Sequence, residues 1–191
     1  AVIERKFVGG TCINYGCTPT KAMVASARVA HLARKSRDYG VHTGKISVDF
    51  PNVIARKDEI VHDFRDGSAK RLKSADNIEF ISGHASFSGE KQVSVNLSSG
   101  GERELTAEHI FINAGARARV PGIEGLDTVP WLDNAGIMEL TELPRHLVVL
   151  GGGYIGLEFG QMLRRFGSEV SIVDHNTHLM AREDDDVSEA I

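Results

Sequence analysis

Residues 147–156 read LVVLGGGYIG, a run of four apolar residues that leads directly into a cluster of glycines. The apolar residues predict a strand at residues 146–150, and the periodicity that follows predicts an amphipathic helix at residues 154–166, ended by Gly167. A second strand is expected at residues 169–174. This order of strand, turn, helix and strand is typical of a βαβ unit, and hence of an α/β fold.

The turn between the first strand and the helix fits the pattern G-x-G-x-x-G, with its glycines at Gly151, Gly153 and Gly156. In a dinucleotide-binding turn the first glycine makes the tight turn, and the second lets backbone N–H groups approach a pyrophosphate. The third lets helix and strand pack closely. A glycine turn in another kind of α/β sheet is the alternative interpretation.

An acidic residue is expected at the end of the next strand, about 20 residues further on, where it would bind a ribose 2′-hydroxyl. Asp174 stands at that position. A carboxylate would repel a 2′-phosphate, so the sequence favours NADH over NADPH, although His175 beside it offers a 2′-phosphate a possible partner.

The rest of the chain predicts two more helices and a group of strands. The helices are expected at residues 19–35 and 51–74, the second with Asp49 as its cap. Three short β-rich runs separated by glycine-rich breaks predict a small antiparallel meander, at residues 78–81, 93–97 and 109–112. The acidic residues 183–186 are interpreted as the first turn of a helix.

Composition excludes several classes of protein. The 191 residues are 41% hydrophobic and 25% charged, as in ordinary globular proteins. The net charge of −4 argues against a nucleic-acid partner. No apolar run reaches the roughly 18 residues of a membrane span, so no membrane association and a cytoplasmic location are expected. The chain begins with Ala1 inside an apolar run, and we expect it to be an interior piece of a longer protein.

Cys12 and Cys17 are the only cysteines. Two cysteines cannot complete a structural zinc site, so no resident metal is expected, and redox chemistry is the leading interpretation. On a regular helix, residues five apart point about 140° away from each other. A disulfide between them therefore needs a distorted turn, for which Gly16 supplies a permissive backbone before a helix beginning at Pro19. Two inert cysteines are the alternative.

These residues lie in the stretch 9–21, GGTCINYGCTPTK, which resembles the motif G-G-T-C-x4-G-C-x-P-[ST]-K of the class I pyridine nucleotide-disulfide oxidoreductases. The family includes dihydrolipoamide dehydrogenase, glutathione reductase and mercuric reductase. Residues 2–4, 83–85 and 112–116 follow the family order, and residues 143–159 are most similar to the mercuric reductase and dihydrolipoamide dehydrogenase branch. The resemblance covers essentially the whole chain.

The resemblance implies a Rossmann-like FAD-binding domain with an antiparallel meander, followed by the start of a second Rossmann-like domain that binds NAD(P). The boundaries expected are residues 1–117 for the partial FAD domain, 118–145 for a connection and 146–191 for the partial NAD(P) domain. The first strand with its glycine motif, the second half of the NAD(P) domain and a dimerisation domain would lie outside this chain. A homodimer is expected for the full-length enzyme.

The family's catalytic roles pass to matching residues. Cys17 would face the flavin, and Cys12 would be the interchange thiol that attacks the substrate. Lys21 would lie near the flavin as a buried cation paired with Glu158, because each would be unfavourable to bury alone. Tyr154 would cover the flavin and move aside for nicotinamide, with ordinary helix packing as the alternative.

Cofactor contacts are implied in the same way. Glu4 would bind the adenosine ribose of FAD. The remaining flavin contacts implied by the resemblance are Thr11, Cys12, Lys21, Ala85, Ala114, Gly115 and Ala116. At Ala114 the family usually has threonine, which weakens the expectation for that contact. Around the second glycine motif the implied cofactor-binding residues are Gly151, Gly153, Tyr154, Ile155, Gly156, Glu158 and Asp174.

The function implied is an oxidoreductase that passes a hydride from NAD(P)H through FAD to the Cys12/Cys17 disulfide. From there electrons would go to a small-molecule disulfide or to a metal ion such as Hg(II), in the context of cell redox homeostasis. Two alternatives stay open. One is a dihydrolipoamide dehydrogenase using NAD, and the other is a nucleotide-binding redox sensor without catalysis.

Overall fold

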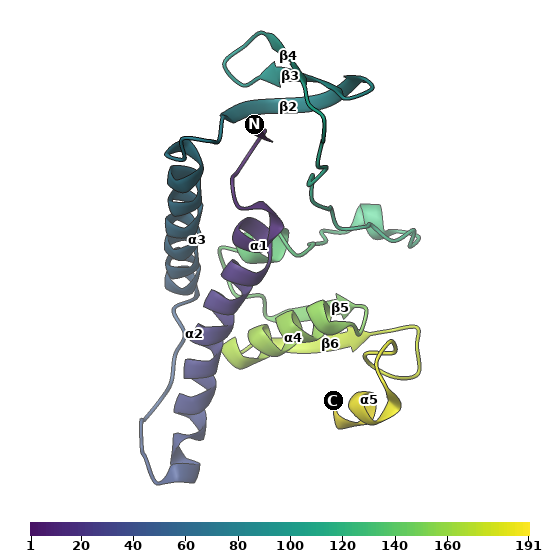
Figure 1. The fold of residues 1–191 in the computed structure, drawn as a ribbon. Helices are drawn as coiled ribbons and strands as arrows, with labels where there is room; N and C mark the ends of the chain where they lie inside the picture. Colours follow the sequence, from purple (N-terminus) through teal and green to yellow (C-terminus); the bar gives the residue numbers. More distant parts are fainter. The chain divides into compact units, whose positions relative to one another are not determined.

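The computed structural model describes residues 1–191 (Figure 1). The chain divides into two compact units: residues 1–18 with 59–122 form the first unit, and residues 19–58 with 123–191 form the second. Helices α2 (Cys17–Lys35) and α3 (Phe50–Lys73) each contribute residues to both units. Both helices were predicted to within two residues, and Asp49 caps α3 by accepting a hydrogen bond from the Asn52 N–H at 3.1 Å.

Four strands form the sheet of the first unit, in the order β1 (Val2–Glu4), β2 (Phe80–Gly89), β3 (Gln92–Leu97) and β4 (Glu102–Thr106). β1 is parallel to β2, whereas β2, β3 and β4 are antiparallel neighbours. Ile81, Val93 and Val95 form the buried cluster of this sheet. The predicted antiparallel meander is therefore confirmed, with one strand joined to it in parallel.

Two strands of the meander differ from their predicted positions. The first prediction, residues 78–81, overlaps only the beginning of β2. The third prediction, residues 109–112, is wrong, because these residues form no regular structure and β4 comes earlier. Gly100 and Gly101 have φ of 93° and 87° and turn the chain back directly after β3. β4 is an edge strand with only Leu105 half-buried, so it carries little apolar signal.

A βαβ unit lies in the second unit. Strand β5 (His146–Leu150) is parallel to β6 (Glu169–Val173), and α4 (Tyr154–Phe166) connects them. The helix ends at Gly167, whose φ of 131° favours glycine. These elements agree with their predicted bounds to within one residue. The acidic stretch 183–186 spans the start of α5 (Asp185–Ala190), also as expected.

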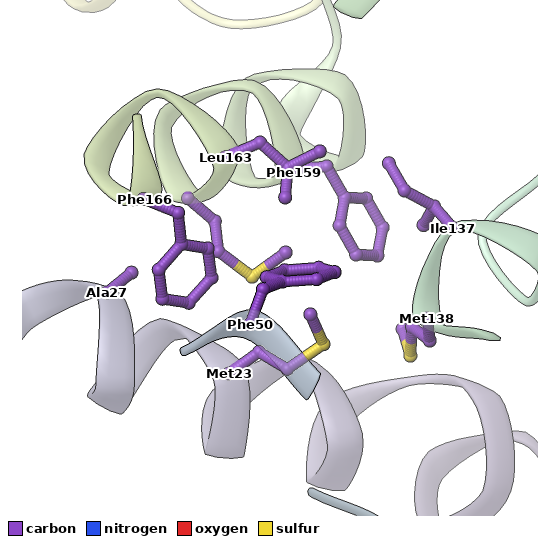
Figure 2. Close-up of a cluster of buried hydrophobic side chains, with 9 residues drawn as sticks. Met23, Ala27, Phe50, Ile137, Met138, Phe159, Leu163 and Phe166 are labelled. Atoms are coloured by element: carbon purple, nitrogen blue, oxygen red, sulfur yellow. The ribbon is translucent and has the colours of Figure 1, made fainter. Parts of the chain in front are cut away.

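A hydrophobic cluster packs α2 and α4 together within the second unit (Figure 2). Its buried members come from α2, α3, α4 and the 3₁₀ turn η3 (Gly136–Glu139), and they are Met23, Ala27, Phe50, Ile137, Met138, Phe159, Met162, Leu163 and Phe166. The rings of Phe50 and Phe166 meet edge to face at 5.7 Å. Burial of each large apolar side chain contributes about 1.5–3 kcal/mol, so this cluster fixes α2 against α4.

Arg34 supports the same packing at the far end of α4. Its guanidinium donates hydrogen bonds to the carbonyl oxygens of Arg165 and Phe166, the latter at 3.2 Å. These carbonyls belong to the last turn of α4 and lack helical partners. Two further 3₁₀ turns, η1 (Ser36–Tyr39) and η2 (Leu126–Thr128), lie in connections. None of the helices combines the length and apolar character needed to cross a membrane.

Candidate functional site

The cysteine pair lies where two helices meet. Cys12 is on the short helix α1 (Gly10–Tyr15), and Cys17 is the first residue of α2. Cys12 is a free, exposed thiol, and Cys17 is exposed as well. The distorted turn expected at Gly16 is present, although α2 begins at Cys17 rather than at Pro19.

The missing side chain of Gly16 allows this turn to close. A Cβ at that position would lie 3.0 Å from the carbonyl oxygen of Thr11 and 3.4 Å from the Cα of Cys12. Such contacts are tight against backbone atoms that cannot yield easily. Gly16 therefore lets the chain fold back onto the segment that carries the first cysteine.

Two of the predicted flavin contacts come together in the first unit. A Cβ at Gly115 would lie 3.6 Å from Oγ1 of Thr11, and the φ of 75° at Gly115 favours glycine. Ala114 and Ala116 beside it are exposed. The chain thus presents a small, open backbone segment next to the hydroxyl that precedes Cys12.

Two more of the predicted flavin contacts lie on strands of the same unit. Glu4 ends β1, and its carboxylate accepts a hydrogen bond from the N–H of Lys6 at 2.8 Å. Ala85 is on β2, exposed and opposite Val95. Nothing in this geometry assigns either residue a role, so their cofactor contacts stay predictions.

Lys21 and Glu158 form an ion pair between α2 and α4 in the second unit. The pairing expected from the resemblance is therefore present. The expected burial of Lys21 is wrong: 65% of its side chain is exposed, against 29% for Glu158. The pair stands at the edge of the hydrophobic cluster, where the cation keeps its solvent contact.

The glycine-rich turn leaves the start of α4 open. Gly151 has a φ of 104°, and nothing lies within 4 Å of a Cβ placed at Gly151 or at Gly153. Gly153 caps α4 without a side-chain hydrogen bond. The N–H groups in the first turn of α4 therefore stay available to donate hydrogen bonds to an anion, and the helix dipole also favours negative charge there.

Gly156 performs the packing role expected of the third glycine. A Cβ there would lie 2.5 Å from the carbonyl oxygen of Gly151 and 2.9 Å from Cγ1 of Val149. Tyr154 and Ile155, the first two residues of α4, are 69% and 47% exposed. Tyr154 is thus not held by ordinary helix packing, and its ring is accessible.

Asp174 follows β6 and reaches back to the glycine-rich turn. Its carboxylate accepts hydrogen bonds from the backbone N–H of Gly152 and from both the backbone and side-chain nitrogens of Asn176, the last two at 2.7 and 2.8 Å. The N–H groups of Asn176 and Gly152 hold the pKa of Asp174 below its usual range. The carboxylate is therefore ionised beside the open turn.

Leu179 covers the second residue of the turn. A Cβ at Gly152 would lie 2.5 Å from Cδ2 of Leu179, and the N–H of Met180 donates to the carbonyl oxygen of Gly152 at 2.9 Å. The chain after β6 therefore folds back over Gly152. In the G-x-G-x-x-G pattern any residue is allowed at position 152, so the sequence did not predict the contact between Gly152 and Leu179.

Asn14 is a second feature that sequence reasoning missed. It is the only buried residue of α1, lies between the two cysteines, and makes three side-chain hydrogen bonds. Asparagine is unfavourable inside helices, because its side chain competes for backbone groups. The position of this asparagine between the two cysteines was the sequence signal that could have indicated its structural role.

The structure has three features expected of a pyridine nucleotide-disulfide oxidoreductase: an open glycine-rich turn before a helix, an acidic residue beside that turn, and two exposed cysteines on either side of a helix break. The chain belongs to the pyridine nucleotide-disulphide oxidoreductase family, whose family model matches residues 1–191. Its α/β architecture is that of this family.

The chain is similar to relatives that are named for different activities. The chain is 36% identical to mercuric reductase of Bacillus cereus over 191 residues, covering 100% of this chain and 30% of that protein. It is 36% identical to dihydrolipoyl dehydrogenase of Zymomonas mobilis over 189 residues, covering 98% and 40%. The structure of the HOCl-induced flavoprotein disulfide reductase RclA from Escherichia coli matches with a TM-score of 0.82 and 38% identity, over 98% of this chain and 39% of that one. The chain thus spans less than half the length of these relatives.

Proposed function

We propose that the protein is a flavin-dependent reductase that carries electrons from NAD(P)H through FAD to a Cys12/Cys17 disulfide and on to an external acceptor. The observation that carries this proposal is the break at Gly16, which separates the short helix that carries the exposed Cys12 from the helix that begins at the exposed Cys17. Membership of the family over the whole chain supports it.

The residues present fit the two cofactors. A Cβ at Gly115 would contact Oγ1 of Thr11 at 3.6 Å, so the glycine leaves the backbone beside that hydroxyl open to a flat ring system. The uncapped first turn of α4 suits a pyrophosphate, as the glycine motif requires. When bound, NAD(P)H supplies a hydride and FAD accepts and passes on its two electrons.

The cysteines perform the transfer to the acceptor. Two electrons and one proton delivered to the pair break the Sγ–Sγ bond, leaving Cys17 as the thiolate and Cys12 as the thiol. Cys12 gives up its proton as it attacks an acceptor disulfide, and the leaving sulfur takes up that proton. Attack of the Cys17 thiolate on the Cys12 sulfur restores the disulfide and releases the second acceptor sulfur, which takes a proton from solvent. With a metal acceptor, the ion takes both electrons and the pair releases its one proton.

Asp174 supports a preference for NADH. A carboxylate has about four acceptor sites. Three are used by the hydrogen bonds from Gly152 and Asn176, which leaves one for a ribose hydroxyl. Its negative charge disfavours a 2′-phosphate. On the same proposal, Lys21 with Glu158 and the exposed Tyr154 face the cofactors, and Glu4 and Ala85 bind FAD.

Two acceptor classes follow from the relatives. One relative is named for mercuric ion, which favours a soft metal ion such as Hg(II), and RclA has also been solved as a complex with a second metal ion, Cu(II). Another relative is named for dihydrolipoyl oxidation, which favours a small dithiol with NAD as acceptor. Side-by-side rates with Hg(II) and with dihydrolipoamide separate the two. Homodimer formation, the cytoplasmic location and the domain boundaries at residues 117 and 145 stay predictions.

Anaerobic titration of the purified holoprotein with NADH tests the proposal. We expect a broad long-wavelength absorption band from a thiolate against the flavin. Cys17→Ser should abolish the band and Cys12→Ser should retain it, because only Cys17 is assigned to the flavin side. A wild-type protein that is reduced without this band contradicts the proposal and favours a non-catalytic redox sensor. KM values for NADH and NADPH in wild type and Asp174→Ala test the nucleotide preference.

A further inference from the structure

The side chain of Asn14 ties together the backbone that leads to Cys12. Its Nδ2 donates to the carbonyl oxygens of Val8 at 3.1 Å and Gly10 at 2.8 Å. Its Oδ1 accepts a hydrogen bond from Nε of Arg65 at 2.8 Å. Both N–H donors of the amide and one acceptor site are therefore used, and the side chain is buried.

The segment held by this amide is difficult to maintain otherwise. Gly9 and Gly10 have φ of 101° and 59°, so two successive residues adopt left-handed backbone. The helix that follows, α1, has only six residues and no side-chain cap at its N-terminus. Helices this short are unstable in isolation. Contacts outside the helix must therefore keep α1, and Cys12 with it, in place.

Arg65 connects the amide to α3 within the first unit. Its guanidinium carbon lies 3.9 Å from the ring centroid of Phe7, a stacking and cation–π contact. Lys6 lies 5.4 Å from the same ring. The arginine is thus oriented by an aromatic face while its Nε holds the Asn14 carbonyl. This orientation directs the amide N–H groups toward Val8 and Gly10.

We propose that Asn14, oriented by Arg65, is a positioning residue that holds α1 and thereby fixes where Cys12 lies relative to Cys17. This inference rests on the proposed disulfide chemistry. The amide clamp raises the effective concentration of one thiol at the other, and so favours the disulfide over the dithiol. Without it, α1 frays, the dithiol gains freedom, and disulfide formation becomes less favourable.

The equilibrium that reports this effect is thiol–disulfide exchange with dithiothreitol. The Cys12–Cys17 disulfide and reduced dithiothreitol yield the protein dithiol and oxidised dithiothreitol, with two electrons and two protons transferred. The holoprotein is equilibrated anaerobically across a series of ratios of the two forms and quenched with an alkylating reagent. Mass spectrometry then gives the fraction of each cysteine that is modified.

Four variants separate positioning from general loss of structure. Asn14→Ala removes all three hydrogen bonds, whereas Asn14→Asp keeps an acceptor for Arg65 but cannot donate to Val8 and Gly10. We expect both to lower the disulfide equilibrium constant about tenfold, a shift of about 30 mV toward easier reduction. Arg65→Met should shift it in the same direction by about threefold. Ser94→Ala, which removes a buried hydrogen bond to Glu102 in the same unit, should leave it unchanged.

The outcomes are distinguishable. If wild type forms no reversible Cys12–Cys17 disulfide, the proposed function fails and this inference with it. If wild type forms one but Asn14→Ala and Asn14→Asp match its equilibrium within twofold, the positioning role alone is overturned. A shift in Ser94→Ala as large as that in Asn14→Ala also overturns it. Should the Asn14 variants not fold, an unchanged equilibrium in Arg65→Met rejects the proposal.

Discussion

Two glycine-rich segments lead into helices: residues 9–16, which contain α1 and precede α2, and residues 151–156, which begin α4. In the first segment, the closed turn, Ile13 lies 2.6 Å from a Cβ placed at Gly9 and the Thr11 carbonyl lies 3.0 Å from one at Gly16, and only Gly10 has free space. In the second segment, the open turn, Cβ atoms at Gly152 and Gly156 would meet neighbours at 2.5 Å, but nothing lies within 4 Å at Gly151 or Gly153. Space filled by the segment's own atoms suits chemistry between its own residues, whereas the free space at Gly151 and Gly153 suits a ligand from outside.

Gly156→Ala and Gly153→Ala provide the sharpest test of the open turn. At Gly156 the new Cβ meets the Gly151 carbonyl at 2.5 Å, so we expect about 2–3 kcal/mol lower stability and poor nucleotide binding. At Gly153 the space is open, so the unfolding free energy should change by less than about 0.5 kcal/mol while NADH affinity falls at least tenfold. Denaturant unfolding measures the stability of each variant, and titration with NADH measures its affinity for the nucleotide. Unchanged affinity in Gly153→Ala would show that ligands do not use this space.

The closed turn is tested with Gly9→Ala against Gly10→Ala. Both positions have positive φ, of 101° and 59°, so an alanine is strained at either by about 1–2 kcal/mol. Only Gly9 also meets a packed neighbour, because Ile13 occupies its Cβ position, whereas Gly10 faces open space. We therefore expect Gly9→Ala to be the less stable variant in denaturant unfolding. Equal stability would mean that the turn is not closed by Ile13.

The smallest expected effect concerns pH. The pKa of Asp174 is lowered in the folded protein by the N–H groups of Asn176 and Gly152. Its contribution to stability is therefore present above the unfolded carboxyl pKa of about 4 and is lost as pH falls through the lowered value. The stability difference between wild type and Asp174→Asn should shrink between about pH 5 and pH 3. The amide of Asn14 does not titrate, so the difference for Asn14→Ala should stay constant; a parallel decline in both contradicts this distinction.

The elements predicted well are those specified by local pattern. Strand β5 and helix α4 agree with prediction because alternation, helical periodicity and the stop at Gly167 all lie within the segment itself. The position of Asp174 follows from the length of one helix and one strand. β4 was missed because an edge strand needs few apolar residues.

Contacts between distant segments could not be predicted from local sequence pattern. The hydrogen bond between Asn14 and Arg65 joins α1 to α3, and no periodicity marks either partner. The Lys21–Glu158 pair was expected from family resemblance, yet its exposure depends on how α2 and α4 pack, which no local signal determines. The covering of Gly152 by Leu179 is of the same kind.

The contact between Leu179 and Gly152 links two positions 27 residues apart. A Cβ at residue 152 would displace Cδ2 of Leu179, which is the end of a flexible side chain, and would also lie 3.1 Å from Oδ2 of Asp174. A side chain acquired at residue 152 therefore makes Leu179 change its rotamer and presses on the carboxylate beside the turn. A position that the dinucleotide motif leaves variable is thus coupled in this chain to a residue outside the motif.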